Sequence, residues 1–388
     1  MSNYDVIIIG AGAAGLMCAR VATALGKNVL VIDHNEKPGR KIIISGGGRC
    51  NFTNLNATYE NYLCKNQHFV KSALAQYTPY DFLDMVGKYK IKYFDKQYGA
   101  LFCQNSSQEI LNMLLQECSK AKFQMNCKTS KIIKSDCFEV ATNLGNFKAN
   151  SLVVATGGLS IAKLGATGFG YDIARQFNLK VIPPKPALDG FKLNKDDLKY
   201  FYDLAGVSSN ILISIKHKIY KEPILFTHQG LSGPASLKAS LYFDETDIIK
   251  INWLPDFSLN DSFYDTNNLN IKLENFLNLH LPKRLTAALI DKHNFKNLKL
   301  NELKRKYFSD IINLLQNYEV KPVSTIGYQK AEVTKFGVDT DELYSNSMEV
   351  KSVKGLYFIG EVVDVTGELG GYNFQWAWSS GYVAGLNV

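Results

Sequence analysis

Three glycines near the N-terminus have the spacing of a dinucleotide-binding loop. Gly10, Gly12 and Gly15 come directly after the β-branched run 6–9, and a helical stretch over 16–25 follows. In such a loop the first glycine permits a tight turn, the second lets the backbone approach a pyrophosphate, and the third lets helix and strand pack closely. The free amides and the positive dipole end of the helix would then hold the anion.

An acidic residue follows where it could meet a ribose. A second apolar run, 28–32, ends in Asp33. A carboxylate at this point can accept hydrogen bonds from ribose hydroxyls. Glycine spacing alone is weak, but strand, glycines, helix, second strand and acid in this order predict a dinucleotide site. NAD and FAD both remain open here, and a chance glycine-rich turn is the alternative.

The next segment, 35–54, combines three consecutive glycines, 46–48, with the cations Arg40, Lys41 and Arg49. Backbone without side chains can be approached closely by a flat ring or a phosphate. Ordering such a segment without a ligand would cost considerable entropy. The segment therefore favours a flavin, with a mobile surface loop as the alternative.

Two later segments also place glycines after strands. The buried-type strand 151–155 ends in Thr-Gly-Gly at 156–158, where backbone could meet the dinucleotide again. Near the C-terminus a strand ends at Glu361, and the glycine-rich run 367–381 leads into a short final helix. Glu361 is placed to hold ribityl or phosphate-adjacent hydroxyls, and the amides of 371–373 could face electron-rich ring atoms. An ordinary strand and helix that complete the sheet are the alternative.

Three side chains are candidates for chemistry, and each also has a structural interpretation. Cys50 follows Arg49, whose charge could favour a thiolate, although a buried structural thiol is the alternative. His228 lies between glycine-containing turns and could act as a general acid or simply hold its loop. Tyr372 could donate to a substrate carbonyl or only pack. These residues leave the catalytic side chain unassigned.

Charge and composition indicate a globular protein with a solvated surface. The 388 residues carry 44 Lys and Arg against 36 Asp and Glu, a net charge of +8. The lysines are scattered, and the densest cluster is the short run 304–306. Nucleic-acid binding usually shows a concentrated basic stripe. We therefore do not expect a nucleic-acid partner, although the charge could favour anionic ligands.

The cysteines and the apolar runs bear on location. Seven cysteines, an odd number without a CxxC pair, indicate free thiols in a reducing compartment and no zinc site. The apolar runs fall short of the ~20 residues of a spanning helix. The N-terminus lacks the basic start of a signal peptide. We expect a cytoplasmic protein without membrane segments or a metal.

The middle of the chain has a different pattern. The proline-rich run 183–186 indicates a domain boundary. Short alternating strands follow over 188–247, and apolar residues at helical spacing occupy 270–317. A strand-rich insert therefore carries a smaller helical insert.

Four separated segments together resemble the two-dinucleotide-binding-fold flavoproteins, namely 4–33, 39–54, 151–171 and 355–385. Within that superfamily the chain resembles a bacterial family of FAD-dependent oxidoreductases known as aminoacetone-oxidase-family or bile-acid-reductase-like flavoproteins. The run 45–54, Ser-Gly-Gly-Gly-Arg-Cys-Asn-Phe-Thr-Asn, is the most specific motif. The runs 227–234 and 360–381 match as well, and 333–338 departs from the usual pattern at Phe336.

The resemblance implies an α/β fold with a split, Rossmann-like FAD-binding domain. It places that domain at 1–187 and 325–388, a β-barrel-like inserted domain at 188–255 and 318–324, and a helical insert at 256–317.

The resemblance also implies non-covalent FAD. Thr129 would meet the adenine through its backbone. The residues that it assigns to FAD are Gly10, Gly12, Ala13, Ala14, Gly15, Asp33, His34, Arg40, Lys41, Gly47, Gly48, Asn51, Thr129, Thr156, Gly157, Gly158, Gly360, Glu361, Gly371, Tyr372 and Asn373.

The expected activity is that of an FAD-dependent reductase of a small organic substrate. Hydride would pass from NAD(P)H through flavin N5 to an acceptor such as a conjugated enone. The chain shows no second strand–GxGxxG–helix unit, so NAD(P)H would bind transiently. A flavin-dependent tRNA-modifying enzyme, an oxidase of amines or aminoketones that uses O₂, and a non-enzymatic flavin-binding protein are the alternatives. Substrate identity and oligomeric state stay open.

Overall fold

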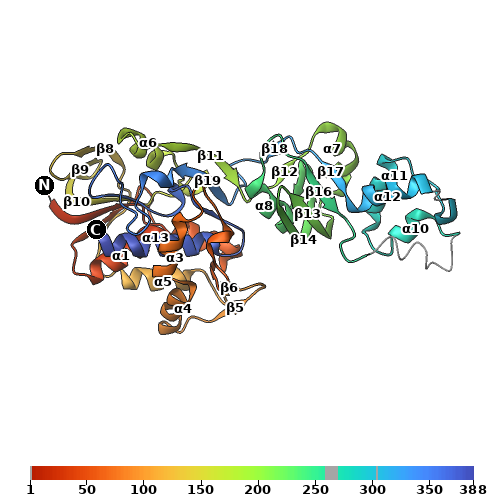
Figure 1. The fold of residues 1–388 in the computed structure, drawn as a ribbon. Helices are drawn as coiled ribbons and strands as arrows, with labels where there is room; N and C mark the ends of the chain where they lie inside the picture. The colour runs from red at the N-terminus through yellow and green to blue at the C-terminus, as the bar shows by residue number, and fades with distance from the viewer. Residues whose placement is uncertain (1, 258–269, 303–304) are drawn as a thin grey trace. The chain divides into compact units, whose positions relative to one another are not determined.

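The computed structural model describes residues 2–257, 270–302 and 305–388 (Figure 1). Its contacts divide the chain into two units: unit 1 comprises Met1–Pro186 and Val333–Val388, and unit 2 comprises Ala187–Glu332. Each unit has a sheet of its own, so each is described separately.

A mainly parallel sheet forms the centre of unit 1. In spatial order its strands are β7 (Lys122–Gln124), β2 (Val29–Ile32), β1 (Ser2–Ile9), β10 (Gly145–Val154), β9 (Phe138–Thr142) and β8 (Thr129–Lys134), and β20 (Leu356–Phe358) also pairs with β10. All pairs are parallel except those that involve β9. Central residues such as Ile7, beside Leu30 and Leu152, are buried, as in a sheet covered on both faces. This arrangement confirms the predicted α/β fold with a Rossmann-type sheet.

The longer helices of unit 1 come from both the N-terminal and the C-terminal part of the chain. They are α1 (Ala13–Ala24), α3 (Phe69–Gln76), α4 (Pro79–Lys88), α5 (Gln108–Glu117), α6 (Phe169–Gln176) and α13 (Tyr372–Asn387). The last helix is longer than the short one expected from the sequence. Glycines let α13 approach α1 closely: a Cβ at Gly381 would lie 2.5 Å from the carbonyl oxygen of Ala14. The N-terminal and C-terminal helices therefore lie side by side (Figure 1).

The glycine-rich segment after β2 is more regular than the sequence predicted. It forms α2 (Arg40–Ile44), the 3-10 turn η1 (Ser45–Gly48) and β3 (Asn51–Asn54). Gly46, Gly47 and Gly48 have φ angles of 57°, 67° and 83°, a left-handed run that glycine adopts most readily. The strand β3 pairs with β6 (Ala100–Cys103), and β6 pairs with β5 (Tyr93–Asp95). A small three-stranded sheet therefore holds the end of this segment.

Two further strand pairs and several short turns complete unit 1. The pairs are β4 (Tyr62–Leu63) with β21 (Thr366–Gly367), and β11 (Val181–Ala187) with β19 (Val333–Val338). The predicted proline boundary lies within β11, which pairs with β19 on one side, a position where proline is tolerated. The remaining 3-10 turns are η2 (Tyr59–Asn61), η3 (Ala162–Leu164), η6 (Thr340–Glu342) and η7 (Gly360–Val362).

Unit 2 is built on an antiparallel sheet. Its spatial order is β17 (Tyr318–Val320), β16 (Ile249–Asn252), β13 (Ser208–Ile215), β14 (Lys218–Thr227), β15 (Gly230–Ser232), β12 (Phe191–Lys192) and β18 (Ser324–Thr325). Its helices and 3-10 turns are α7 (Lys195–Phe201), η4 (Tyr202–Leu204), α8 (Gly233–Tyr242), α10 (Leu273–Leu277), α11 (Lys283–Lys292), η5 (Leu300–Glu302) and α12 (Arg305–Gln316). Trp253 is buried against the rings of Phe226 and Tyr318 in its core.

The division of the insert into a strand-rich and a helical part stays a prediction. Residues 258–269 and 303–304, which include Lys304 of the predicted basic cluster, lie outside the described residues. Within the described ranges, none of the helices combines the length and the apolar character that crossing a bilayer requires.

Candidate functional site

Several predicted cofactor residues of unit 1 lie where its parallel strands end. Because β1, β2, β10 and β20 run in the same direction, their carboxyl ends meet at one edge of the sheet. Backbone hydrogen bonds join the residues at the carboxyl ends of these strands. The Gly10 amide donates to the Ile32 carbonyl, and the Ala155 amide donates to the Ile9 carbonyl. This edge carries the glycine loop, Asp33, residues 156–158 and Glu361. This edge is the candidate functional site.

The glycine loop has the geometry that its spacing predicts. A Cβ at Gly10 would lie 2.3 Å from the carbonyl oxygen of Ala155, and one at Gly15 would lie 2.0 Å from that of Gly10. A Cβ at Gly12 would meet no described atom within 4 Å. Gly12 also begins α1 without a side-chain cap. Two glycines therefore permit close packing, while Gly12, followed by the half-buried Ala13, presents backbone to open space where a pyrophosphate fits.

The Asp33 carboxylate is held by its neighbours. Its Oδ2 accepts a hydrogen bond from the amide of Ala11 at 2.8 Å, and its Oδ1 accepts from the amide of Asn35 at 2.8 Å and from the Asn35 side chain at 3.0 Å. A carboxylate can accept about four hydrogen bonds, so a ribose hydroxyl can still be bound. His34 is exposed, and its Nε2 lies 2.7 Å from the carbonyl oxygen of Gly165. The imidazole thus connects the turn before α6 to this end of the site.

The predicted adenine-side residue lies near Asp33. The amide of Cys127 donates to the Asp33 carbonyl at 2.8 Å, and that of Asn126 donates to the Asn35 carbonyl at 2.9 Å. Thr129 begins β8 two residues later. Its Oγ1 is buried and has no hydrogen-bond partner among the described residues. Such an unsatisfied group fits a site that a ligand completes.

Residues 156–158 follow the end of β10. One of the two glycines in this segment has open space at its Cβ position, and the other does not. Thr156 Oγ1 is buried and finds no partner within the described chain. Gly157 has a φ of 73°, and a Cβ there would meet only Glu361 Oε2, at 4.0 Å. A Cβ at Gly158 would lie 2.5 Å from Thr334 Oγ1. Gly157 therefore leaves room for a ligand, whereas Gly158 is a packing position.

Glu361 lies between two segments that are distant in sequence. Its Oε2 is 2.7 Å from Lys41 Nζ, and its Oε1 accepts a hydrogen bond from the Thr334 amide at 2.8 Å. Arg40, the neighbour of Lys41, donates instead to Asn35 Oδ1 at 2.7 Å. The two adjacent cations therefore point to different parts of the edge, Arg40 to the Asp33 end and Lys41 to Glu361.

The second glycine cluster is bound to β3. The Asn51 side chain, in the orientation that satisfies both of its groups, donates to the Leu101 carbonyl at 3.1 Å and accepts from the Gly371 amide at 3.0 Å. Asn54 donates to the carbonyl of Gly370 at 2.8 Å. Asn373 exchanges two hydrogen bonds with Gly367, at 2.8 and 2.9 Å. These bonds fix the loop that precedes α13, whose first turn has no side-chain cap.

Other predicted cofactor positions differ in how open they are. Cβ atoms at Gly47 and Gly48 would meet nothing within 4 Å among the described residues, so their backbone can be approached. Gly360 is different, because a Cβ there would lie 2.9 Å from that of Ala14, which is buried. The Gly360 amide and carbonyl are bonded to Ser380 and Trp376. Gly360 and Ala14 therefore serve packing in this structure.

The structure separates the three catalytic candidates. Cys50 is fully buried at a φ of 44°, and burial raises the pKa of its thiol, so a reactive thiolate is not supported. Tyr372 is buried, and burial raises the pKa of its hydroxyl to about 12. His228 is exposed in unit 2, where its ring contacts Tyr202 at 4.9 Å between centroids. Of the three, Tyr372 adjoins the glycine-rich loop before α13.

Two residues at the site were missed by the sequence analysis. Thr334 positions Glu361 through its amide, and its Oγ1 accepts hydrogen bonds from the amides of Leu159 and Ser160 at 2.8 and 3.1 Å. Asn35 connects Asp33 to Arg40. The only available signal was that 333–338 follows the family pattern up to Phe336.

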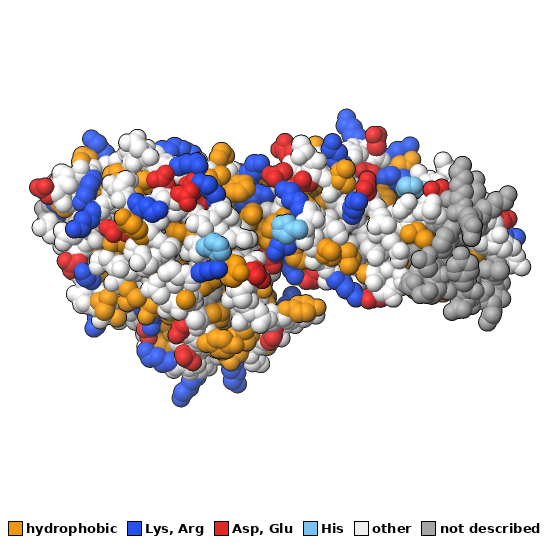
Figure 2. All heavy atoms as spheres, viewed as in Figure 1, with side chains coloured by type: hydrophobic (Ala, Val, Ile, Leu, Met, Phe, Trp, Pro, Cys, Tyr) orange, Lys and Arg blue, Asp and Glu red, His pale blue; other side chains and the backbone are white. Residues whose placement is uncertain are grey.

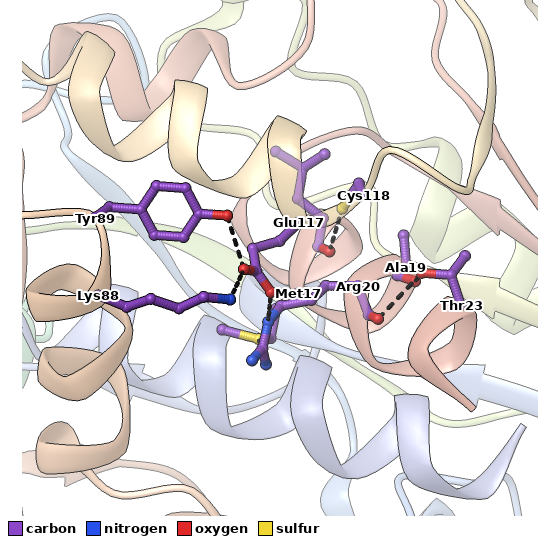
Figure 3. A network of polar contacts seen from close by, with 9 residues as sticks. Met17, Ala19, Arg20, Thr23, Lys88, Tyr89, Glu117 and Cys118 are labelled. Carbon is purple, nitrogen blue, oxygen red and sulfur yellow. Dashed lines mark hydrogen bonds and ion pairs between the residues drawn. The ribbon is translucent and has the colours of Figure 1, made fainter. Parts of the chain in front are cut away.

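A separate polar network joins three helices of unit 1 (Figure 3). Glu117 of α5 accepts hydrogen bonds from Lys88 at 2.7 Å, from Tyr89 at 2.8 Å and from Arg20 of α1 at 3.0 Å. Burial alone would raise the pKa of Glu117, but these three donors outweigh it and lower the pKa to about 2. The network contains none of the predicted cofactor residues, and we assign it a structural role.

The edge described above fits a dinucleotide on its own geometry. Gly12, Gly47, Gly48 and Gly157 expose backbone, while Thr129 and Thr156 offer unsatisfied hydroxyls. A Rossmann-type sheet with such an edge defines a dinucleotide-binding protein.

The chain belongs to the HI0933-like protein Rossmann domain family, which it matches over residues 4–387. The protein is a flavoprotein enzyme, and its cofactor is FAD.

Comparison with known proteins identifies relatives over the whole chain. The chain is 46% identical over 394 residues to the ribosomal RNA dihydrouridine synthase of Escherichia coli (strain K12), an alignment that covers 100% of this chain and 98% of the relative. It is 28% identical to the 3-dehydro-bile acid delta(4,6)-reductase of Clostridium scindens, with 97% of both chains covered. A solved 3-ketosteroid-delta4-(5alpha)-dehydrogenase from Rhodococcus jostii RHA1 is similar in fold, with a TM-score of 0.51, 12% identity, and 99% of this chain and 97% of that chain covered.

Proposed function

We propose that this protein reduces a uridine of ribosomal RNA to dihydrouridine, with NAD(P)H as the electron donor. The observation that supports this most is the 46% identity, over the whole of this chain and 98% of the relative, to a protein named for that reaction. When bound, FAD supplies hydride-transfer chemistry, while the protein supplies binding, orientation and electrostatics.

The chemistry of uracil agrees with a flavoprotein reductase. Its C5=C6 bond is conjugated with the C4 carbonyl, so hydride addition at C6 leaves negative charge on O4, and a proton then adds to C5. Hydride from NAD(P)H and one proton from solvent balance the reaction. The site must therefore supply groups that stabilise the negative charge on O4 and a group that delivers the proton to C5.

The residues at the loop before α13 suit the first of these tasks. The uncapped amides of the first turn of α13 carry the positive end of a helix dipole, which favours negative charge nearby. The hydroxyl of Tyr372 is protonated at neutral pH, as that of a tyrosine ordinarily is, and burial raises its pKa further, to about 12. In this proposal these groups stabilise charge on the substrate carbonyl. We assign no role to Cys50, whose side chain is fully buried.

The proposal revises two of our expectations. From the sequence we expected a small-molecule substrate and no nucleic acid, because the cations are scattered. The cations on the visible face are indeed spread out (Figure 2), but the relative's name supports an RNA substrate. The flavin-dependent RNA-modifying alternative, which we expected to act on tRNA, now becomes the main proposal with ribosomal RNA as its substrate.

A second candidate function is reduction of a conjugated enone in a small molecule. The 28% identity over 97% of both chains to a bile-acid delta(4,6)-reductase favours it. Both candidate reactions reduce a carbon–carbon double bond, and in each case a carbonyl can be conjugated with it. The same site geometry therefore suits either substrate, and the experiment must compare the two.

The test uses the purified protein loaded with FAD under anaerobic conditions. Ribosomal RNA from a strain that lacks this gene is incubated with the protein and with NADPH or NADH, and nucleosides are then analysed by mass spectrometry. We expect dihydrouridine to appear only with protein and reductant together. A parallel reaction contains a 3-oxo-4-ene steroid. Reduction of the steroid without any dihydrouridine would overturn the RNA proposal in favour of the second candidate.

A further inference from the structure

A hairpin next to the glycine triplet has an unusual face. In β5 and β6, the half-buried rings of Phe94 and Phe102 stack with centroids 5.8 Å apart and planes at 21°. The Arg49 guanidinium lies 5.9 Å from the centre of the Phe94 ring, and Lys96 Nζ lies 5.5 Å from that of Phe102. We call these four residues the hairpin face. It combines two aromatic rings with two cations.

The cations of the hairpin face are not neutralised by the protein. Arg49 and Lys96 are exposed, and neither forms an ion pair with any residue that the structure describes. The acid of the hairpin, Asp95, instead accepts a hydrogen bond from the Gly99 amide at 3.2 Å within the turn. Beyond it, Tyr98 at the tip is 74% exposed. A purely structural ring pair would require neither the free cations nor the exposed tyrosine.

The hairpin face adjoins the cofactor edge. A Cβ at Gly46 would lie 3.0 Å from the Phe102 ring, so this ring packs on the glycine triplet. The amide of Cys103 donates to the Arg49 carbonyl at 2.8 Å. The neighbouring strand β3 carries Asn51, which binds the Gly371 amide. The face is therefore one strand away from the loop that precedes α13.

Aromatic rings beside cations are the chemistry of single-strand recognition. Bases stack on aromatic side chains with little sequence preference, while Lys and Arg contact the backbone phosphates. Arginine also stabilises stacked rings through cation–π interactions. An acidic ligand without aromatic groups would make no use of the rings, and an apolar ligand would make no use of the cations.

We propose that the hairpin face binds single-stranded RNA next to the uridine that is reduced, with a base on the Phe94–Phe102 pair and phosphates on Arg49 and Lys96. This inference rests on the proposed function, and it adds the binding surface to it. The β5–β6 hairpin extends from unit 1 (Figure 1). In this proposal the RNA lies along the hairpin and reaches the glycine triplet.

The experiment measures RNA binding by the FAD-loaded protein. The probe is a fluorescently labelled single-stranded RNA of about 12 nucleotides with a central uridine, within the range of known single-strand sites. Its anisotropy is recorded between 50 and 200 mM salt for wild type, Lys96→Gln and Phe94→Leu. The matched control is Lys27→Gln, an exposed lysine before β2 at the opposite edge of the sheet. Flavin absorbance and thermal unfolding establish that each variant folds.

Each variant has a distinct expected result. Lys96→Gln removes one phosphate contact, so the slope of log affinity against log salt becomes shallower by about 0.7. Phe94→Leu removes a stacking partner, and the affinity falls about 5- to 100-fold. Lys27→Gln behaves like wild type. Equal losses in Lys27→Gln and Lys96→Gln would mean nonspecific attraction and would overturn the proposal.

The remaining outcomes separate this inference from the proposed function. Wild type could form dihydrouridine in ribosomal RNA while Lys96→Gln and Phe94→Leu bind the probe normally. The proposed RNA binding by the hairpin face would then be wrong, and the proposed function would stand. If wild type binds the probe with the expected variant effects but forms no dihydrouridine, the face stands and the function is wrong. If wild type does not bind the probe at 50 mM salt, the inference fails whatever the reaction shows.

Discussion

Lys41 Nζ lies 2.7 Å from Glu361 Oε2, although 320 residues separate the two in the chain. The other oxygen of the same carboxylate accepts from the Thr334 amide at 2.8 Å. Glu361 therefore joins the segment after the first βαβ unit to the C-terminal part of unit 1. Gly157 lies beside it with an open Cβ position. The ion pair thus borders the space that we assign to the cofactor.

Replacement of Glu361 by glutamine tests this ion pair. Glu361→Gln keeps an acceptor for the Thr334 amide but leaves the Lys41 charge without its partner. We expect a loss of FAD affinity because Lys41 would no longer hold the side chain at position 361 in place. The loss should be modest, about 5-fold, because the ion pair is partly exposed. Titration of apoprotein with FAD, followed by flavin fluorescence, measures it. The control is Glu60→Gln, an exposed acid in η2. An unchanged affinity in Glu361→Gln would remove this residue from the cofactor site.

Two glycines of the same loop should respond differently to valine. Gly12 has a φ of −86°, which valine adopts, and open space at its Cβ. We expect Gly12→Val to fold but to lose most of its FAD, because the side chain fills the space of the pyrophosphate. Gly15→Val would instead collide with the Gly10 carbonyl and destabilise the protein by about 1–3 kcal/mol or more. Thermal unfolding and the flavin absorbance of the purified proteins distinguish the two. A Gly12→Val protein with full FAD content would contradict the assignment.

Glu117 makes stability depend on acid pH. Its pKa is lowered from 4.5 to about 2, so the folded state favours the ionised form. This contribution is present above pH 4.5 and is lost as the pH falls toward 2. We expect Glu117→Gln to lower the free energy of unfolding at pH 6, measured by denaturant titration, by about 1–3 kcal/mol, because charged hydrogen bonds are lost. The difference from wild type should shrink between pH 4.5 and 2. A difference independent of pH would show that the carboxylate charge has no part in it.

Asp364 should produce the opposite pH dependence. It is fully buried, and burial together with nearby Asp339 raises its pKa to about 7 despite the hydrogen bond from the Lys65 amide. The folded state therefore favours the protonated acid, and stability falls as the pH rises from 3.8 to about 7. Asp364→Asn removes this titration, so we expect it to gain stability relative to wild type at pH 8 compared with pH 5. Thermal unfolding at both pH values measures this, with the exposed Asp136→Asn as control. A parallel change in both variants would contradict the role of Asp364.

Part of the candidate site could be predicted from local sequence. Gly10, Gly12, Gly15 and Asp33 could be assigned because their roles depend on consecutive elements, a strand, a tight turn, a helix and a second strand. Local backbone geometry follows from local residue type. The α/β fold was predictable for the same reason, since buried strands and helices alternate in the first part of the chain.

Which of the remaining candidates have free space beside them, and which are enclosed by other residues, depends on the tertiary structure. Cys50 lies beside the glycine triplet in sequence, but its thiol is buried. Gly157 and Gly158 are adjacent, yet only the first has room at its Cβ, because Thr334 approaches the second from a distant strand. The hairpin face likewise depends on β6 pairing with β3. These outcomes depend on contacts between residues far apart in the chain, and residue type or spacing does not encode which distant atoms meet.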